Sequence, residues 1–453
     1  MRRTAVTVFC ASLLLSTSAL ASGFGLRESS ASSLGLSYAG VAANGSHAST
    51  LTFNPGLLGD VNEFDVSSSA IGLLPETDGT FAATTTQLSP LVPPTVLGGT
   101  MHPKDIVNTA LIPALGVRYR LTDQFIVGLT LSSPWGLTTD YGPDSVTRYY
   151  NIKSDVKTVN ITPMIGWQPV PEFTLGVGFQ LQYIKGNLTK AIDFGTIGAA
   201  NGIPFAVPGA MDGNVALKAQ DWGEGFVIGA EWKPCADLSF GLSYRSAIDN
   251  TLKGKELFTL DPAHAPYPSV GATLAAVTGM FADGPATAKF TTPYVITFGA
   301  KWKATDQLTV LVGGDYTGWN SFKDLIAHSA NPVQPDDVTV FDFKNSWYGS
   351  VGVEYKPNQD WTLRLGTAYD QTPTTDEFRT PGIPDGSRYW ISAGVGYRLT
   401  DNMDVDVSIA RLTAQKGNIS LNQLQEGNLL RGNLMGSVNM AVTLLGVELS
   451  YHI

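Results

Sequence analysis

The sequence contains few cysteines and few charged residues, and it has no long apolar segment beyond its N-terminus. Cys10 and Cys235 are the only two cysteines in 453 residues, and Cys10 lies in the N-terminal leader described below. An exported chain would therefore keep one cysteine, which excludes an intramolecular disulfide. Charged residues make up 15% of the chain, fewer than in an average soluble protein. After residue 21 we find no run of about 18 apolar residues, so no transmembrane helix is predicted.

The N-terminus has the pattern of a secretory signal peptide. Arg2 and Arg3 precede an apolar run over 5–15, and the small residues of Ala19-Leu20-Ala21 fit a cleavage site before Ser22. The alternative, a retained membrane anchor, fits poorly because the apolar run is too short to span a bilayer. Without the two leader arginines, 27 cationic residues face 39 acidic ones, a net charge of −12. Together with the absence of a basic run, this argues against a nucleic-acid partner.

A short segment with the chemistry of a turn recurs six times. In each copy, Tyr or Trp is followed six positions later by a large apolar residue, with Pro, Asp, Asn, Thr or a cation between them. The copies are YRLTDQF (119–125), WQPVPEF (167–173), WKPCADL (232–238), WKATDQL (302–308), YKPNQDW (355–361) and YRLTDNM (397–403). Tyr and Trp at strand ends are typical of the aromatic girdles of membrane barrels.

The residues beside these turns alternate with period two. After Phe173, large apolar residues occupy 175, 177, 179, 181 and 183, while Thr, Gly and Gln occupy the positions between them. Successive side chains of a strand point to opposite faces, so one face is apolar and the other is small or polar. This pattern favours an antiparallel transmembrane β-barrel over a soluble all-β protein.

The six turns also give the number of strands. If both termini and all six turns lie on the periplasmic side, seven hairpins and hence fourteen strands result, an even number as in other single-chain bacterial barrels. The first strand is expected near Val61. Long external loops are predicted at 73–108, 137–156, 187–221, 247–290, 318–345, 371–388 and 412–432. In the fourth loop, Ser269 is expected to cap a helix with Val270, Leu274, Val277 and Phe281 on one face.

The segment between the cleavage site and the first strand is rich in Ala, Ser, Gly and Asn. About forty residues without a long hydrophobic face cannot fold alone, and the inward barrel positions are small enough to leave space in the lumen. We therefore interpret 22–60 as a plug, or hatch, inside a barrel formed by 61–453. A disordered periplasmic tail is the alternative.

GFGLRESSASSLGLSYAGVAANGSHASTLTFNPG (23–56) resembles the N-terminal hatch of the FadL family of outer-membrane transporters for long-chain fatty acids and hydrocarbons. The match rests on a Gly-Phe-x-Leu-x-Glu stretch, a Leu-Gly-x-x-Tyr-x-Gly stretch and a final Asn-Pro. Three departures occur: Gly56 follows Asn54-Pro55 where the family has Ala, Asn44-Gly45-Ser46-His47 replaces acidic residues, and the chain ends in Ile453 where Phe is usual.

The resemblance implies passive diffusion of a hydrophobic ligand into the barrel, movement of the hatch, and release sideways through the wall into outer-membrane lipid. It assigns a gate contact to Asn54, Pro55 and Gly56, although a simple turn also explains this tripeptide. A lateral opening is expected at Ser133, Pro134, Trp135 and Gly136, because Pro and Gly interrupt strand ladders. The alternative is the ordinary outer end of a strand.

Seven residues are candidates for contact with the ligand. Phe24 and Leu26 lie near the free N-terminus, and Phe205, Leu274 and Phe281 are apolar residues of the long loops, where exposed apolar patches indicate binding but loop packing is an equal alternative. Arg245 and Arg364 face inward and are expected to pair with a ligand carboxylate or with barrel carboxylates.

The other functions considered are an aromatic hydrocarbon channel of the same fold, an outer-membrane lipase and an open general porin. The five histidines have no spacing typical of a catalytic triad or metal site, and no Gly-x-Ser-x-Gly motif occurs. We therefore expect no enzyme activity, no cofactor and no metal. The expected partners are a hydrophobic small molecule and lipid, and the expected state is a monomer in the outer membrane.

Overall fold

The structure is a computed structural model that describes residues 22–90, 93–263 and 265–453. The predicted signal peptide, 1–21, lies outside the described residues. Among the described residues, no helix has the length and apolar character needed to cross a membrane.

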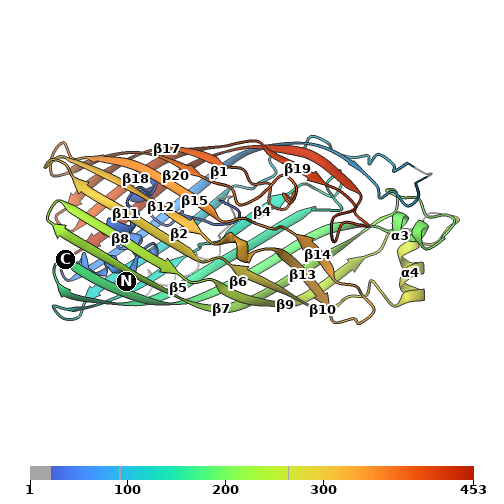
Figure 1. The fold of residues 1–453 in the computed structure, drawn as a ribbon, viewed down its shortest axis with the longest axis horizontal. Helices are drawn as coiled ribbons and strands as arrows, with labels where there is room; N and C mark the ends of the chain where they lie inside the picture. The colour runs from blue at the N-terminus through green and yellow to red at the C-terminus, as the bar shows by residue number, and fades with distance from the viewer. Residues whose placement is uncertain (1–21, 91–92, 264) are drawn as a thin grey trace, which may run out of the picture.

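Twenty strand segments form one antiparallel sheet that closes into a barrel (Figure 1). Grouped by hairpin, they make fourteen barrel strands within the described residues, six of which are interrupted once. In chain order these are β1 Phe64–Thr84, β2 Ala110–Arg120, β3 Phe125–Ser132 with β4 Gly136–Asp140, β5 Lys153–Val170, β6 Phe173–Asp193, β7 Asp212–Cys235, β8 Leu238–Arg245 with β9 Ile248–Thr259, β10 Gly284–Thr292 with β11 Val295–Lys303, β12 Leu308–Thr317 with β13 Asp324–Ser329, β14 Asp337–Val340 with β15 Ser346–Tyr355, β16 Trp361–Asp370, β17 Arg388–Thr400, β18 Met403–Ala414 with β19 Gly417–Leu421, and β20 Asn433–His452.

The first and last strands close the barrel. β1 pairs with β20 from Asp65 opposite His452 to Thr84 opposite Asn433, so that neither strand leaves a free edge. The predicted fourteen-stranded antiparallel barrel is confirmed. Its outward positions are large and apolar and remain exposed in the isolated chain, for example Val177, Phe179, Leu242 and Leu365. These are the positions that meet lipid in a membrane barrel.

All six predicted turns connect neighbouring strands at one end, called the turn end below, and the C-terminus lies at the same end (Figure 1). The predicted loop boundaries were wrong at several strands. β1 begins at Phe64 and runs to Thr84, β6 runs to Asp193 and β9 to Thr259, all well into the predicted loops. About ten residues per strand suffice to cross the bilayer. Beyond that height both faces of a strand meet polar surroundings, so the alternation that marks a strand fades.

The opposite end, the loop end, carries two helices, α3 Phe194–Ala200 and α4 Val270–Thr278 (Figure 1). The predicted helix at Ser269 is present, and the Ser269 side chain accepts a hydrogen bond from the backbone N–H of Ala272. Val270 and Leu274 are buried as expected, whereas Val277 is 81% exposed and points away from them. Phe281 follows the helix, and its ring packs on Phe194 with 4.9 Å between centroids.

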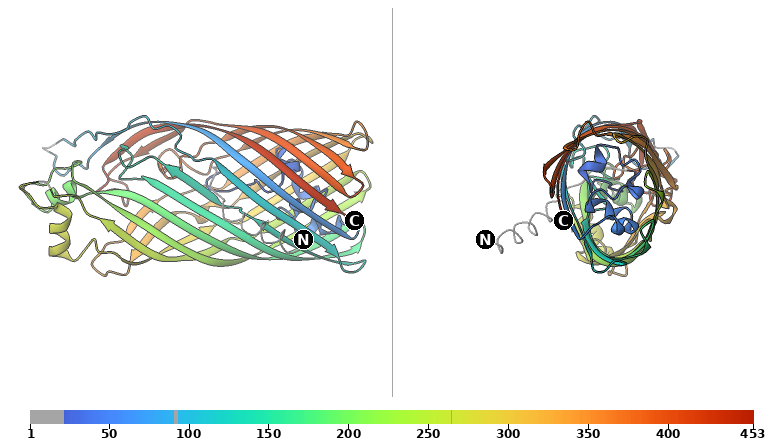
Figure 2. Two further views of the ribbon diagram at one scale, coloured as in Figure 1. Left: turned by 180° about the vertical axis from the view of Figure 1, so that it is seen from behind. Right: turned by 90° about the vertical axis from the view of Figure 1, so that its left-hand side faces the viewer.

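The N-terminal segment lies inside the barrel, towards the turn end: the right panel of Figure 2 shows it in the lumen and the left panel shows its position along the barrel. It contains α2 Ala31–Leu34 and three short 3₁₀ helices, η2 Val41–Ala43, η3 Ala48–Thr52 and η4 Pro55–Gly59. A further 3₁₀ turn, η5 Trp319–Ser321, interrupts the barrel wall after β12. We use the term hatch for residues 22–60.

Small inward residues of the barrel make room for the hatch. A Cβ atom added at Gly176 of β6 would lie 2.1 Å from the carbonyl oxygen of Pro55, so only glycine fits there. Ten residues further along the same strand, Gly186 also faces inward, but its nearest neighbour would be a Leu252 methyl group 3.9 Å away. Glycine at 176 is therefore required by the hatch, whereas glycine at 186 is not.

Gly176→Ala should lower the stability of the folded barrel by about 1–3 kcal/mol, because the added methyl group overlaps the hatch backbone. The matched variant Gly186→Ala, on the same face of the same strand, should unfold at the wild-type midpoint. The measurement is the fraction of folded protein, by gel mobility of unheated samples, across a temperature series. Equal midpoints for the two variants would show that the hatch does not lie against Gly176.

Candidate functional site

The barrel wall is interrupted in its third strand. β3 ends at Ser132 and β4 begins at Gly136, with Ser133, Pro134 and Trp135 between them outside the ladder. β2 pairs with β3 as far as Leu115 opposite Leu131, and β4 pairs with β5. Beyond the break, an isolated bridge between Val107 and Thr139 connects the segment before β2 to β4 within the described residues. Proline has no N–H to donate, which suits a gap of this kind.

The free N-terminal end of the hatch bonds to the backbone at this break. The N–H of Leu26 donates to the carbonyl of Pro134 at 2.8 Å, and the N–H of Gly136 donates to the carbonyl of Phe24 at 2.8 Å. Backbone groups that the wall leaves without a strand partner are thus satisfied by the hatch. The hatch residues 24–26 act as a short extra strand inside the wall.

A cavity of about 740 Å³ lies against the break, and we call it the kink cavity. Ser133, Pro134 and Trp135 line one side of it, and hatch residues 25–29 with Thr52 and Phe53 line another. Arg27 of the hatch forms an ion pair with Asp315 of β12 here, and its guanidinium lies 3.8 Å from the centre of the Tyr348 ring. Burial raises the pKa of the neighbouring Glu28 carboxyl, which is 3% exposed.

Arg245, at the end of β8, contributes a partly buried positive charge to the kink cavity. Its guanidinium donates to the side-chain oxygen of Gln180 and to the backbone carbonyl of Thr52. Among the described residues, no carboxylate lies within ion-pair distance of it. A partly buried charge with no counter-charge is unfavourable, so this guanidinium is well placed to receive an anion.

A second, larger cavity of about 1100 Å³ lies towards the loop end, and we call it the outer cavity. Its walls come from many strands and are largely apolar, and they include Val156, Leu188, Leu217, Leu252, Phe290, Phe341 and Ile383. One polar side contains Lys190, which is ion-paired with Asp337, and the buried Glu256. A largely apolar cavity with a few polar groups is typical of a small-molecule site.

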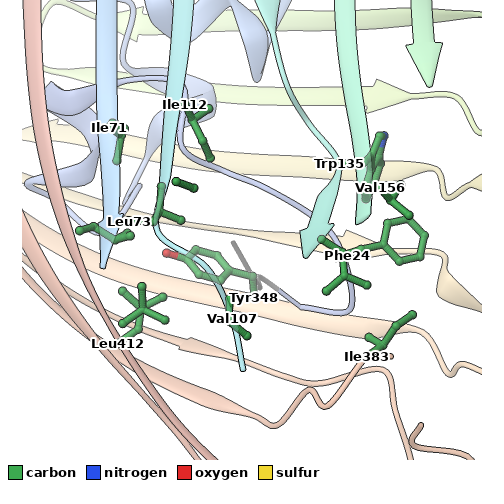
Figure 3. Close-up of a cluster of buried hydrophobic side chains, with 14 of the residues drawn as sticks. Phe24, Ile71, Leu73, Val107, Ile112, Trp135, Val156, Tyr348, Ile383 and Leu412 are labelled. Atoms are coloured by element: carbon green, nitrogen blue, oxygen red, sulfur yellow. The ribbon is translucent and has the colours of Figure 1, made fainter. Parts of the chain in front are cut away.

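Phe24 separates the two cavities. Its ring lies in an aromatic cluster, with centroid distances of 5.9 Å to Trp135 (Figure 3), 4.6 Å to Trp319 and 5.1 Å to each of Phe290 and Phe322. Trp135 and Trp319 line the kink cavity, whereas Phe24, Phe290 and Phe322 line the outer one. A molecule passing from one cavity to the other must therefore displace Phe24 or its aromatic neighbours.

Asn54, Pro55 and Gly56 lie elsewhere in the hatch, and they line neither of these cavities. The Asn54 amide nitrogen donates to the carbonyls of Ala42 at 2.6 Å and Ala230 at 3.0 Å, and its oxygen accepts from Gly56 at 2.8 Å. Asn54 therefore caps η4 and ties two parts of the hatch to β7. Its neighbours Thr52 and Phe53 reach the kink cavity.

Arg364 lies at the turn end, far from both cavities in the fold. It is ion-paired with Glu354 at 3.1 Å and with Asp406, and Asp406 also contacts His47 of the hatch at 3.2 Å. This cluster borders a polar cavity of about 1610 Å³ that opens at the turn end, which we call the turn-end mouth. The placement matches pairing with barrel carboxylates, the second of the two roles considered for this arginine.

The loop residues proposed for the ligand pack on one another. Leu274 and Phe281 are buried in a cluster with Phe194, and the Phe205 ring stacks on Tyr267 at 4.9 Å. This cluster forms the cap at the loop end and lines neither cavity.

Of the predicted site residues, the structure therefore brings together Phe24, Leu26, Arg245 and the break at 133–136. Sequence reasoning missed Trp319 and Phe322, which complete the aromatic cluster. The sequence does contain a signal for them. A Gly-Trp-Asn-Ser-Phe stretch at 318–322 interrupts an apolar strand, as Pro134-Trp135-Gly136 does in the third strand. Among the described residues there is no cluster of three or more His, Cys, Asp or Glu side chains arranged to hold a metal ion.

Residues 12–453 match the model of a protein family described as outer membrane protein transport protein (OMPP1/FadL/TodX). The chain belongs to this family. It is 27% identical to the long-chain fatty acid transport protein of Escherichia coli O6:H1 over 426 residues, 89% of each chain. It is also 27% identical to a 47 kDa outer membrane protein of Pasteurella multocida over 411 residues, 88% of this chain and 89% of that protein.

Solved structures agree on the fold. A Pseudomonas aeruginosa FadL homologue is 23% identical, with a TM-score of 0.82 over 95% of this chain and 99% of its own. The Ralstonia pickettii toluene transporter TbuX is 18% identical, with a TM-score of 0.63 over the same shares. The chain is thus an outer-membrane β-barrel that transports hydrophobic compounds, and its family is one of channels rather than enzymes.

The contact between His47 and Asp406 predicts a pH dependence of hatch stability. Burial lowers the pKa of His47, but the hydrogen bond and charge of Asp406, together with Glu448, outweigh it and raise the pKa from 6.5 to about 9. Because the folded pKa is the higher one, the stabilisation is complete below about pH 6.5 and is lost as the pH rises through 9. It amounts to at most about 3 kcal/mol.

The wild type should therefore lose more stability between pH 6 and pH 10 than His47→Gln does, as measured by thermal unfolding followed through tryptophan fluorescence. If both proteins lose the same amount, the His47 contact does not stabilise the folded state.

Proposed function

We propose that the transported compounds are long-chain fatty acids or closely related hydrophobic acids. The partly buried Arg245 guanidinium supports this most directly, because it borders the kink cavity and has no carboxylate partner among the described residues. A fatty acid supplies both the missing anion and the apolar chain. An aromatic hydrocarbon supplies no anion and would leave this charge uncompensated.

The proposed route follows the two cavities. The ligand enters the outer cavity from the loop end, passes Phe24, and reaches the kink cavity, where its carboxylate meets Arg245. It then leaves through the break at Ser133, Pro134 and Trp135 when the hatch residues 24–26 release the backbone there. Release into lipid is favoured because each methylene group gains about 0.8 kcal/mol on leaving water.

The relatives named long-chain fatty acid transport protein favour this reading, since the alignment with the Escherichia coli O6:H1 protein covers most of both chains. Uptake of aromatic hydrocarbons is the second candidate, suggested by the fold shared with TbuX. We further propose that the exported chain begins at Ser22, that residues 22–60 form the hatch, that Asn54 fixes the hatch to the wall, and that the protein works as a monomer.

Arg245→Met should weaken oleate binding by about 10- to 100-fold, since a hydrogen-bonded charge pair contributes about 1.5–3 kcal/mol. Toluene uptake should change little. Arg411→Met is the control, because this arginine is paired with Glu76 away from both cavities. The measurements are oleate affinity of the purified protein and uptake of radiolabelled oleate and toluene by cells with equal surface expression. Unchanged oleate binding in Arg245→Met would contradict the proposal, and transport of toluene alone would favour the second candidate.

Asn54→Ala should loosen the hatch, because it removes three hydrogen bonds that join η2, η4 and β7. We expect an increase in ion conductance through planar bilayers and a fall in oleate uptake relative to the wild type. Asn402→Ala, at a turn on the barrel exterior, serves as the control. If Asn54→Ala shows the wild-type ion conductance and the wild-type oleate uptake, Asn54 does not anchor the hatch.

A further inference from the structure

Asp370, the last residue of β16, is a buried carboxylate without an evident partner. It is 1% exposed, and neither of its carboxylate oxygens has a side-chain hydrogen-bond partner among the described residues. No ion pair within 4 Å joins it to a described Lys, Arg or His side chain. A buried carboxylate is stable as an anion only when a cation or hydrogen-bond donors compensate its charge, so a cation is expected beside it.

The group that faces Asp370 is the first described residue of the hatch. The Ser22 backbone lies beside the Asp370 carboxylate, although no hydrogen bond joins the two. The Ser22 hydroxyl donates to the carbonyl of Gln371 at 2.8 Å and lies 3.1 Å from the hydroxyl of Ser346. The next N–H, that of Gly23, donates to Asp385 at 2.9 Å. Ser22 is thus held on several sides by the barrel wall, and it is 7% exposed.

The two arginines that lie near Asp370 pair with other carboxylates. Arg388 pairs with Asp385 at 2.6 Å, and Arg27 pairs with Asp315. Both arginines are therefore engaged elsewhere, and within the described residues Asp370 has no ion pair of its own.

We propose that Asp370 is the binding site for the α-ammonium group of the exported chain, which is created when the signal peptide is cleaved before Ser22. In the precursor the Ser22 nitrogen is a neutral peptide N–H with one proton to donate. After cleavage it becomes an ammonium group with three N–H donors and a positive charge, which matches the two free oxygens of Asp370.

This ion pair would fix the hatch next to the transport route. Phe24, which separates the two cavities, lies two residues from the ammonium group, and Leu26, which bonds to the wall break, lies four residues away. Removal of the signal peptide would thus complete the closed state of the channel. The inference rests on cleavage before Ser22 and is independent of which compound is transported.

The test is a titration of the α-amino group itself. Purified protein is reductively methylated with ¹³C-formaldehyde, which retains the positive charge, and the N-terminal dimethylamine signal is followed by NMR as the pH is raised. Wild type is compared with Asp370→Asn, an isosteric change that removes the charge, and with the control Asp404→Asn at the turn-end mouth. Intact mass identifies the N-terminal residue, and gel mobility confirms folding.

We expect the wild-type and Asp404→Asn midpoints to lie at least one pH unit above the ordinary α-amino range of about 7.7–8.0, and the Asp370→Asn midpoint to fall back towards it. The proposal is overturned if the wild-type midpoint lies within the ordinary range, if Asp370→Asn leaves it unchanged, or if the exported chain begins at a residue other than Ser22. The wild-type titration decides the matter even if the variant fails to fold.

Discussion

The structure depends on how the backbone is satisfied where the third barrel strand is broken. A barrel in a membrane must leave no unpaired backbone groups against lipid, yet Ser133, Pro134 and Trp135 leave the ladder. The hatch meets this requirement from inside, through the Leu26–Pro134 and Gly136–Phe24 hydrogen bonds. The wall is closed here by the hatch rather than by another strand, and the lateral release proposed above requires these two hydrogen bonds to break.

The hatch therefore has two parts that are held by different forces. Its turn-end part is fixed by buried polar contacts, such as the ion pair of Lys233 with Asp60 and the hydrogen bonds that Glu448 accepts from Ser30 and from the backbone of Ser32. Its N-terminal part lies in an aromatic cluster between two apolar cavities. An apolar ligand competes directly with the second set of contacts and leaves the first set intact. On the proposed route, movement of residues 22–29 alone would open the path.

The barrel itself was predictable because its rules are local. The six aromatic-flanked turns and the alternation beside them identified the strands and their number, and the small inward residues indicated a filled lumen. The sequence pattern did not show where strands end beyond the membrane. In β6, for example, Thr189 and Lys190 break the apolar alternation although the strand continues to Asp193. The site was predictable only in part. Phe24, Leu26, Arg245 and the break at 133–136 have sequence signals, but Arg364 has the same inward pattern as Arg245, and only the fold shows that it has two carboxylate partners.

The most direct test of the account is to trace where the ligand leaves the barrel. The photoreactive residue p-benzoylphenylalanine is placed at Trp135, beside the wall break, or at Gln359, which lines the turn-end mouth. Cells are then illuminated during uptake of an alkyne-tagged oleate. The account predicts capture of the fatty acid at position 135 and none above background at position 359. Strong capture at position 359 would show that the ligand passes the hatch towards the periplasm, and would contradict lateral release through the wall.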